Sequence, residues 1–211
     1  MAAVPVRRLT LAALSIALVT LATFVIRIPN PATQGYINLG DGLLFTLALV
    51  FGWRIGGLAG GVGSALADAL GGYFIWAPWT LVIKGIEGIL VGTIAFWGTG
   101  GGHDTEGGLD DQGGRGTSDV SDARSAGAAP AAPGGDHPRR IAAFAAVLVG
   151  GAWMVTGYYL AGSVLFGGIA ALTEIPGNLV QAGVAVVVAL PLSVLLRNAL
   201  KRSDYGPLAP R

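Results

Sequence analysis

The chain contains no cysteine and only two histidines among its 211 residues. The absence of cysteine excludes disulfides, thiolate metal sites and cysteine nucleophiles. The histidines, His103 and His137, have no second ligand at helical spacing, so we predict no metal site and no cofactor. The sequence also lacks HExxH and GxSxG motifs, which argues against an enzyme.

Charge is scarce as well. Only 12% of the residues are charged, whereas 53% are hydrophobic, and the mean hydropathy is +0.65. This balance is typical of a polytopic membrane protein. We therefore expect a multi-pass protein of the cell membrane, surrounded by lipid bilayer and without a nucleic-acid partner.

Long apolar segments predict the fold class, because a membrane-spanning helix needs about 20 residues. We predict an all-α integral membrane protein with six transmembrane helices, at Arg7–Arg27, Leu39–Trp53, Ile55–Gly71, Trp79–Trp97, Arg140–Ala161 and Ile175–Arg197. The uncharged run from Ile141 to Thr173 is too long for one straight span. Its later part, Gly162–Thr173, is expected to form an outer connection.

The positions of Lys and Arg predict the orientation, since cytoplasmic loops retain these residues. With both termini inside the cell, Arg27 is the only cation in an external loop. The cytoplasmic side then holds Arg7, Arg8, Arg54, Arg115, Arg124, Arg139, Arg140, Arg197, Lys201, Arg202 and Arg211.

The segment 98–138 differs in composition from the rest, being rich in Gly, Ala, Asp, Ser and Pro. Because it has almost no large apolar residue, it is predicted to be a disordered cytoplasmic linker. The chain then divides into helices one to four (1–97), this linker, helices five and six (139–199) and a cytoplasmic tail (200–211).

Three ionisable residues interrupt the apolar spans: Asp68, Lys84 and Glu87. Charges inside a membrane are costly and usually face a partner, a cavity or a ligand. Thr80, Lys84 and Glu87 share one helical face by their spacing. Lys84 is expected either to be neutralised, by Glu87 or by Asp68, or to line with Glu87 a pocket open to the outside. We expect Asp68 to anchor the rim of that pocket.

A second polar stripe begins the last span, where Glu174, Asn178 and Gln181 recur at spacings of four and three. Packing between helices and contact with a ligand are both open for these residues. Aromatic residues near the same membrane surface favour a small planar ligand, with an interfacial aromatic belt as the alternative. The predicted ligand contacts are Tyr36, Asn38, Trp76, Trp79, Thr80, Lys84, Glu87, Tyr158, Glu174, Asn178 and Gln181.

Small residues recur every four positions in the third predicted span, at Gly57, Gly61 and Ala65. Such a face lets two backbones approach closely. We expect it to pack within one bundle, with dimerisation as the alternative. Ala13 and Ala17 form a similar pair in the first span, where they could dock another membrane protein.

Several motifs resemble the substrate-binding S components of energy-coupling factor (ECF) transporters. They are GYINLGD, the glycine-rich third span with Ala67 and Asp68, the Trp76-Ala77-Pro78 rim, the Lys84-Gly85-x-Glu87-Gly88 helix, and EIPGNLVQ. Within these transporters, the sequence is most similar to the branch called riboflavin-type. Members of this branch serve several vitamins and precursors.

This resemblance implies a six-helix subunit that captures a vitamin or a vitamin precursor from outside and delivers it by toppling in the membrane. Its partners would be one transmembrane coupling protein and two ATP-binding subunits, with Ala13 and Ala17 in the docking strip. The chain itself has no Walker A motif. The alternative is a self-sufficient ion-coupled carrier or channel that uses Asp68 and Glu87 as proton sites.

Overall fold

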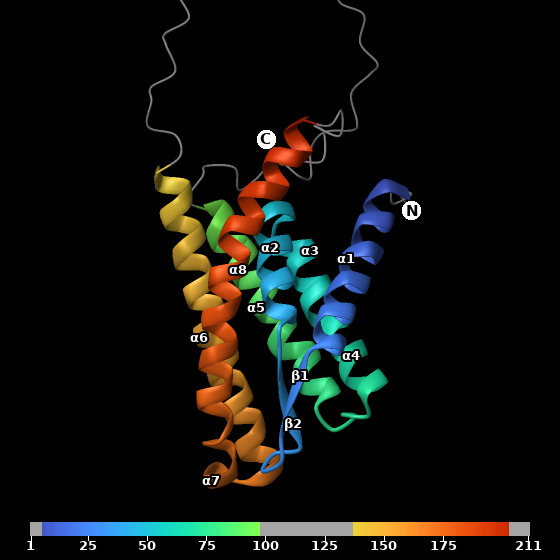
Figure 1. Cartoon of the computed structure of the whole chain (residues 1–211), viewed down its shortest axis with the longest axis vertical. Coiled ribbons are helices and arrows are strands. Elements are labelled where there is room, and N and C mark those ends of the chain that lie inside the picture. Colours follow the sequence, from blue (N-terminus) through green and yellow to red (C-terminus); the bar gives the residue numbers. More distant parts are fainter. Residues whose placement is uncertain (1–5, 98–136, 203–211) are drawn as a thin grey trace, which may run out of the picture.

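The computed structural model describes residues 6–97 and 137–202, and this part of the chain is largely helical (Figure 1). Its elements in chain order are α1 Val6–Val25, β1 Arg27–Asn30, β2 Gly35–Asn38, α2 Gly40–Phe51, α3 Trp53–Leu58, the π-helical turn η1 Ala59–Gly63, α4 Ser64–Gly71, α5 Ala77–Trp97, α6 His137–Phe166, α7 Gly168–Ala171 and α8 Glu174–Arg202.

The six predicted spans fall largely on helices in the structure, although the first reaches into β1 at Arg27 and the second is interrupted at Gly52. Four helical stretches are long and apolar enough to cross a membrane, namely Val6–Val25, Ala77–Trp97, Arg140–Phe166 and Gly168–Arg202. By contrast, α2 has only 12 residues, and the third predicted span is built from α3, η1 and α4. A multi-pass helical membrane protein is therefore confirmed, while the number of six spans stays a prediction.

Two details differ from the expected all-α fold. β1 and β2 form an antiparallel hairpin in the loop before α2, with Ile28 opposite Ile37 and Pro29 opposite Tyr36. α6 continues past Ala161 to Phe166, so the connection expected at Gly162–Thr173 is largely helical. The predicted linker lies outside the described residues except for its last two, His137 and Pro138, which begin α6.

The bundle has two distinct ends. α1 and α6 begin, and α5 and α8 end, at one end, whereas the hairpin and α7 lie at the other (Figure 1). Arg7 and Arg140 stand near the start of their helices, and Lys201 and Arg202 close α8, so these cations share the first end. Arg27 lies at the hairpin end. Which of the two ends faces the cytoplasm stays a prediction from these cations.

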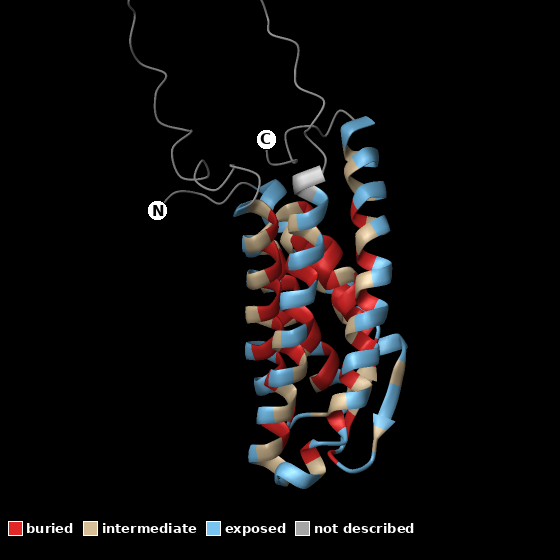
Figure 2. Cartoon of the chain, turned by 90° about the vertical axis from the view of Figure 1, so that its left-hand side faces the viewer, coloured by how far each residue is buried: buried red, intermediate tan, exposed pale blue. Residues whose placement is uncertain are grey.

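The core lies where α2, α5, α6 and α8 meet, around Leu44, Phe45, Val91 and Val147. Buried residues face the bundle interior, and the outward faces of the helices are exposed (Figure 2). Many of these exposed side chains are large and apolar; Val187 is 73% exposed. Since lipid tails are as apolar as leucine, such a surface suits a bilayer.

The glycine face of the third predicted span packs against α5. A Cβ atom on Gly57 would lie 2.8 Å from Ile89 Cγ1, and one on Gly61 would lie 2.8 Å from the Leu81 carbonyl oxygen. At Gly61 the close neighbour is backbone, so only glycine permits this approach of the two helices, whereas at Gly57 the close neighbour is a side chain. Packing of Gly57 and Gly61 within one bundle is thereby confirmed.

Candidate functional site

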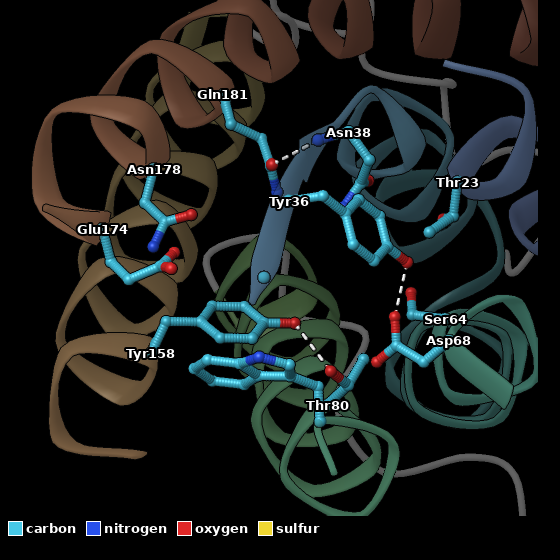
Figure 3. Close-up of a pocket in the computed structure, with 12 residues that line it drawn as sticks. Thr23, Tyr36, Asn38, Ser64, Asp68, Thr80, Tyr158, Glu174, Asn178 and Gln181 are labelled. Atoms are coloured by element: carbon cyan, nitrogen blue, oxygen red, sulfur yellow. Dashed lines mark hydrogen bonds between the residues drawn. The ribbon is translucent and has the colours of Figure 1, made fainter. Parts of the chain in front are cut away.

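A small polar cavity lies between the hairpin and the helices (Figure 3). Its lining comes from α1, β2, α4, α5, α6, α8 and the loop before α5. The lining residues are Thr23, Gly35, Tyr36, Asn38, Ser64, Asp68, Trp76, Thr80, Tyr158, Glu174, Asn178 and Gln181. The cavity volume is about 20 Å³, which is room for roughly one water molecule.

Local periodicity explains why these side chains converge. Tyr36 and Asn38 alternate with Ile37 along β2, so both point to the same face of the hairpin. Glu174 and Asn178 lie one turn apart on α8, and both are buried. The structure thus confirms that the polar stripe of the last predicted span faces inward.

Tyr36 and Asp68 join the hairpin to α4. The Tyr36 hydroxyl donates a hydrogen bond to Asp68 Oδ1. Burial raises the pKa of the Tyr36 phenol, and the neighbouring Asp68 carboxylate raises it further, so Tyr36 remains a hydrogen-bond donor at neutral pH. Asp68 Oδ2 is buried and has no hydrogen-bond partner in the described part of the chain.

Glu174 ties the hairpin to the start of α8. Its Oε1 accepts a hydrogen bond of 3.0 Å from Asn30 Nδ2 and another from the Thr33 hydroxyl. Trp76 adds a third link, because its indole nitrogen donates to the Thr33 carbonyl at 3.1 Å. These contacts hold the hairpin closed over the cavity.

Aromatic rings form one wall. Trp76 and Tyr158 have ring centroids 5.8 Å apart, and Trp76 also stacks on Phe166 at 5.8 Å. The Tyr158 hydroxyl donates to Thr80 Oγ1 at 3.1 Å (Figure 3). The cavity therefore offers flat apolar faces beside its polar groups.

The two buried charged residues of α5, Lys84 and Glu87, follow Thr80 by about one and two helical turns, and both take part in ion pairs. Lys84 Nζ forms an ion pair with Asp41 of α2 and lies 2.9 Å from Glu87 Oε2. Asp41 also accepts a hydrogen bond of 2.7 Å from Gln181 Nε2. Neutralisation of Lys84 by Glu87 is confirmed, whereas its pairing with Asp68 is replaced by Asp41, because α2 packs beside α5.

Gln181 connects this charge cluster (Asp41, Lys84, Glu87) to the cavity. Its Oε1 accepts a 2.8 Å hydrogen bond from the backbone N–H of Asn38, while its amide nitrogen donates to Asp41. One side chain thus fixes both the hairpin and the α2–α8 contact.

Eight predicted contact residues line the cavity: Tyr36, Asn38, Trp76, Thr80, Tyr158, Glu174, Asn178 and Gln181. Lys84, Glu87 and Trp79 do not line it; the first two are buried in the charge cluster, and Trp79 is 36% exposed. The other four lining residues, Thr23, Gly35, Ser64 and Asp68, were not predicted as contacts. Ser64 and Asp68 lie four residues apart, and this spacing in the sequence could have predicted that they share one helical face.

Three buried polar atoms at the cavity lack a hydrogen-bond partner within the described residues. They are Thr23 Oγ1, Asp68 Oδ2 and Asn178 Nδ2, and all belong to lining residues. Most buried polar groups in proteins are paired, so such a concentration at one place is unusual. Across residues 6–97 and 137–202, no cluster of three or more histidine and acidic side chains could hold a metal ion.

Ala13 and Ala17 are exposed on α1, away from the buried face of that helix. They line an open apolar groove between α1 and the η1–α4 region, together with Ile16, Thr20, Leu21, Phe24, Val62, Leu66 and Leu70. The groove is separate from the polar cavity.

Comparison with known proteins places the chain in a family. A family model described as "ECF-type riboflavin transporter, S component" matches residues 4–104 and 126–198. A Pyrococcus woesei protein described as "Uncharacterized protein in gap 3'region" is 35% identical over 86% of this chain and 96% of its own. A UPF0397 protein of Streptococcus pneumoniae (strain Hungary19A-6) is 37% identical over 32% of this chain and 37% of its own. The chain belongs to the S-component family of ECF-type transporters, and it is thus the membrane-embedded substrate-binding subunit of such a transporter.

Proposed function

We propose that this subunit captures a vitamin or vitamin precursor from outside the cell in the cavity beneath the hairpin. The observation that carries the proposal is the convergence of Thr23 Oγ1, Asp68 Oδ2 and Asn178 Nδ2, all buried and unpartnered among the described residues. A ligand with polar groups would satisfy these atoms, and burial makes such hydrogen bonds selective.

The hairpin end faces outward in this proposal. Six spans with both termini in the cytoplasm put Arg27 outside and the remaining end-of-helix cations inside, as retention of cations in cytoplasmic loops requires. The cavity would then open toward the medium that supplies the ligand.

Ligand entry requires the hairpin to move. A drug-sized ligand occupies a pocket of roughly 300 Å³ or more, whereas this cavity measures about 20 Å³. The contacts that close it are hydrogen bonds, from Asn30 and Thr33 to Glu174 and from Trp76 to the Thr33 carbonyl. Such contacts can be exchanged for solvent at small net cost.

Lys84 and Glu87 support the site in this proposal. Through Asp41 they orient Gln181, whose other end holds Asn38. Their effect on ligand affinity is then indirect, through the position of Gln181.

Delivery depends on partners. We propose that the groove containing Ala13 and Ala17 docks a transmembrane coupling protein, and that two ATP-binding subunits energise toppling of this subunit in the membrane. Family membership supports partners of this kind. The exposure of both alanines on a lipid-facing helix fits a surface that a second membrane protein covers.

Purification tests the proposal. The protein in detergent, without ATP, is expected to carry a small molecule that mass spectrometry identifies after denaturation. It should rebind that molecule with one site per chain. If a broad vitamin panel gave no binding and no coupling protein co-purified, the proposal would fail.

A further inference from the structure

The hairpin, residues 27–38, has a single residue that is charged at neutral pH. This residue is Arg27, which begins β1 opposite Asn38 of β2. Arg27 is half-buried and does not line the cavity. Because a cation that loses part of its water needs other favourable contacts, the surroundings of Arg27 indicate what it does.

Aromatic rings surround the Arg27 guanidinium. Its central carbon lies 4.3 Å from the ring centroid of Phe24, 5.6 Å from that of Tyr36 and 5.7 Å from that of Tyr73. The Nη1 atom is buried and has no hydrogen-bond partner within the part of the chain that the structure describes. A planar guanidinium stacks on aromatic faces in a way that a lysine ammonium does not.

Tyr36 connects Arg27 to the cavity. The Tyr36 ring packs against Tyr73 with centroids 4.5 Å apart, and its hydroxyl donates to Asp68 Oδ1 (Figure 3). Both Tyr36 and Asp68 line the cavity. Since Tyr36 occupies Oδ1, Oδ2 is the oxygen of Asp68 that is left for a ligand. A displaced Tyr36 ring would therefore change both a wall of the cavity and this free acceptor.

Gly71, the last residue of α4, provides space for the guanidinium. A Cβ atom at this position would overlap Arg27 Nη1. Alanine is the better helix former at a helical position, so helix stability alone does not call for glycine here. The missing side chain lets Arg27 lie where it contacts the Tyr36 ring.

We infer that Arg27 is a positioning residue for ligand binding. It holds the Tyr36 ring in place and thereby fixes the acceptor that Asp68 presents, although Arg27 itself does not touch the ligand. This inference rests on the proposed function and adds a residue from outside the cavity lining to the same site.

Fluorine NMR tests the hold on Tyr36 without any ligand, on the detergent-purified full chain labelled with 3-fluorotyrosine. Loss of one signal in Tyr36→Phe assigns the Tyr36 resonance. This resonance is expected to broaden in Arg27→Met, because the ring is no longer held in one position. Gly71→Ala, which keeps Arg27 but displaces it, should broaden the same resonance. Arg54→Met removes an arginine that lies 5.1 Å from the Trp53 ring centroid, and this control should leave the Tyr36 resonance narrow.

Titration calorimetry measures the consequence for binding. The probe is the compound that co-purifies with the parent protein or, if the protein purifies empty, the member of the broad vitamin panel that binds most tightly. Arg27→Met and Gly71→Ala should each weaken binding by about tenfold. Arg27→Lys keeps the charge without the planar stack, so its affinity should fall between those of the parent and Arg27→Met.

A double-mutant cycle shows whether Arg27 acts through Tyr36. In a Tyr36→Leu background, Arg27→Met should weaken binding no further, because the ring that Arg27 holds is already gone. A role of Arg27 in general stability would add its own loss in both backgrounds.

The outcomes separate the inference from the proposed function. Parent-like affinity in Arg27→Met, or an equal loss of affinity in the Tyr36→Leu background, overturns the inference and leaves the proposed function standing. A Tyr36 resonance that stays narrow in Arg27→Met also overturns it. If Arg27→Met does not fold, Gly71→Ala decides by the same criteria. If no compound binds the parent protein, the inference and the proposed function fall together.

Discussion

The contacts of Asn178 distinguish a role in helix packing from a role in ligand binding. It is 2% exposed, and its Nδ2 has no hydrogen-bond partner among the described residues. A buried amide without a partner costs stability, so a packing role would leave this atom unexplained. A role in binding explains it, because a ligand supplies the acceptor.

Asn178→Leu is therefore expected to keep or slightly raise thermal stability while it weakens ligand binding by about 10- to 100-fold. The two quantities are measured by a melting curve and by titration of the ligand that co-purifies with the parent protein. Asn198→Leu, on an exposed position of α8, is the matched control. Unchanged affinity together with a lower melting temperature would assign Asn178 to packing.

The charge cluster gives a second prediction for single residues. Lys84 is 1% exposed and balances two buried carboxylates, Asp41 and Glu87. Lys84→Met should destabilise the fold by on the order of 3 kcal/mol, since it leaves both acids uncompensated. Glu87→Gln should cost much less, because the Asp41–Lys84 pair remains. Melting curves in detergent compare the two, and equal destabilisation would contradict this account of the cluster.

Helical periodicity made part of this site predictable from sequence. Glu174, Asn178 and Gln181 share a face because their spacing is set within one helix. The Asp41–Lys84 pair joins residues 43 positions apart and depends on how α2 packs against α5. Asp68 was expected at the rim, but its free oxygen in the cavity follows from the position of Tyr36, which only the folded hairpin determines.

The hairpin is the element on which access to the cavity depends. It carries Tyr36 and Asn38, and its tip is held by Glu174 and Trp76. The sequence was interpreted as all-α and did not predict this hairpin. A proline cannot donate a hydrogen bond to a strand ladder. Pro29 is tolerated because β1 pairs on one side only.

Locking the hairpin should block binding. Asn30 Nδ2 lies 3.2 Å from Thr173 Oγ1, and neither residue lines the cavity. Because the chain has no native cysteine, Asn30→Cys with Thr173→Cys can be joined selectively by a short bismaleimide. Crosslinking before ligand addition is expected to abolish binding, and crosslinking afterwards to slow dissociation at least tenfold.

Each single-cysteine variant, treated with the same reagent, serves as the control and should bind normally. Fluorescence or radioligand exchange measures the rates. Normal ligand entry into the fully crosslinked protein would show that the hairpin is not the gate.

For the whole molecule, capture and delivery lie on different surfaces. The polar cavity lies at the hairpin end, whereas the Ala13–Ala17 groove lies on the outer face of α1. Ala17→Trp should therefore leave ligand binding intact and abolish ATP-dependent uptake, because the bulky ring keeps a partner helix away. Leu148→Trp, on exposed α6, is the control that should preserve uptake. Loss of binding in Ala17→Trp would contradict this separation of surfaces.

Uptake into proteoliposomes tests the central claim most directly. The chain alone is expected to bind its ligand without transporting it, and uptake should begin only when a coupling protein and two ATP-binding subunits are added with ATP. Uptake by the chain alone, driven by a pH gradient, would contradict the account and identify a self-sufficient ion-coupled carrier.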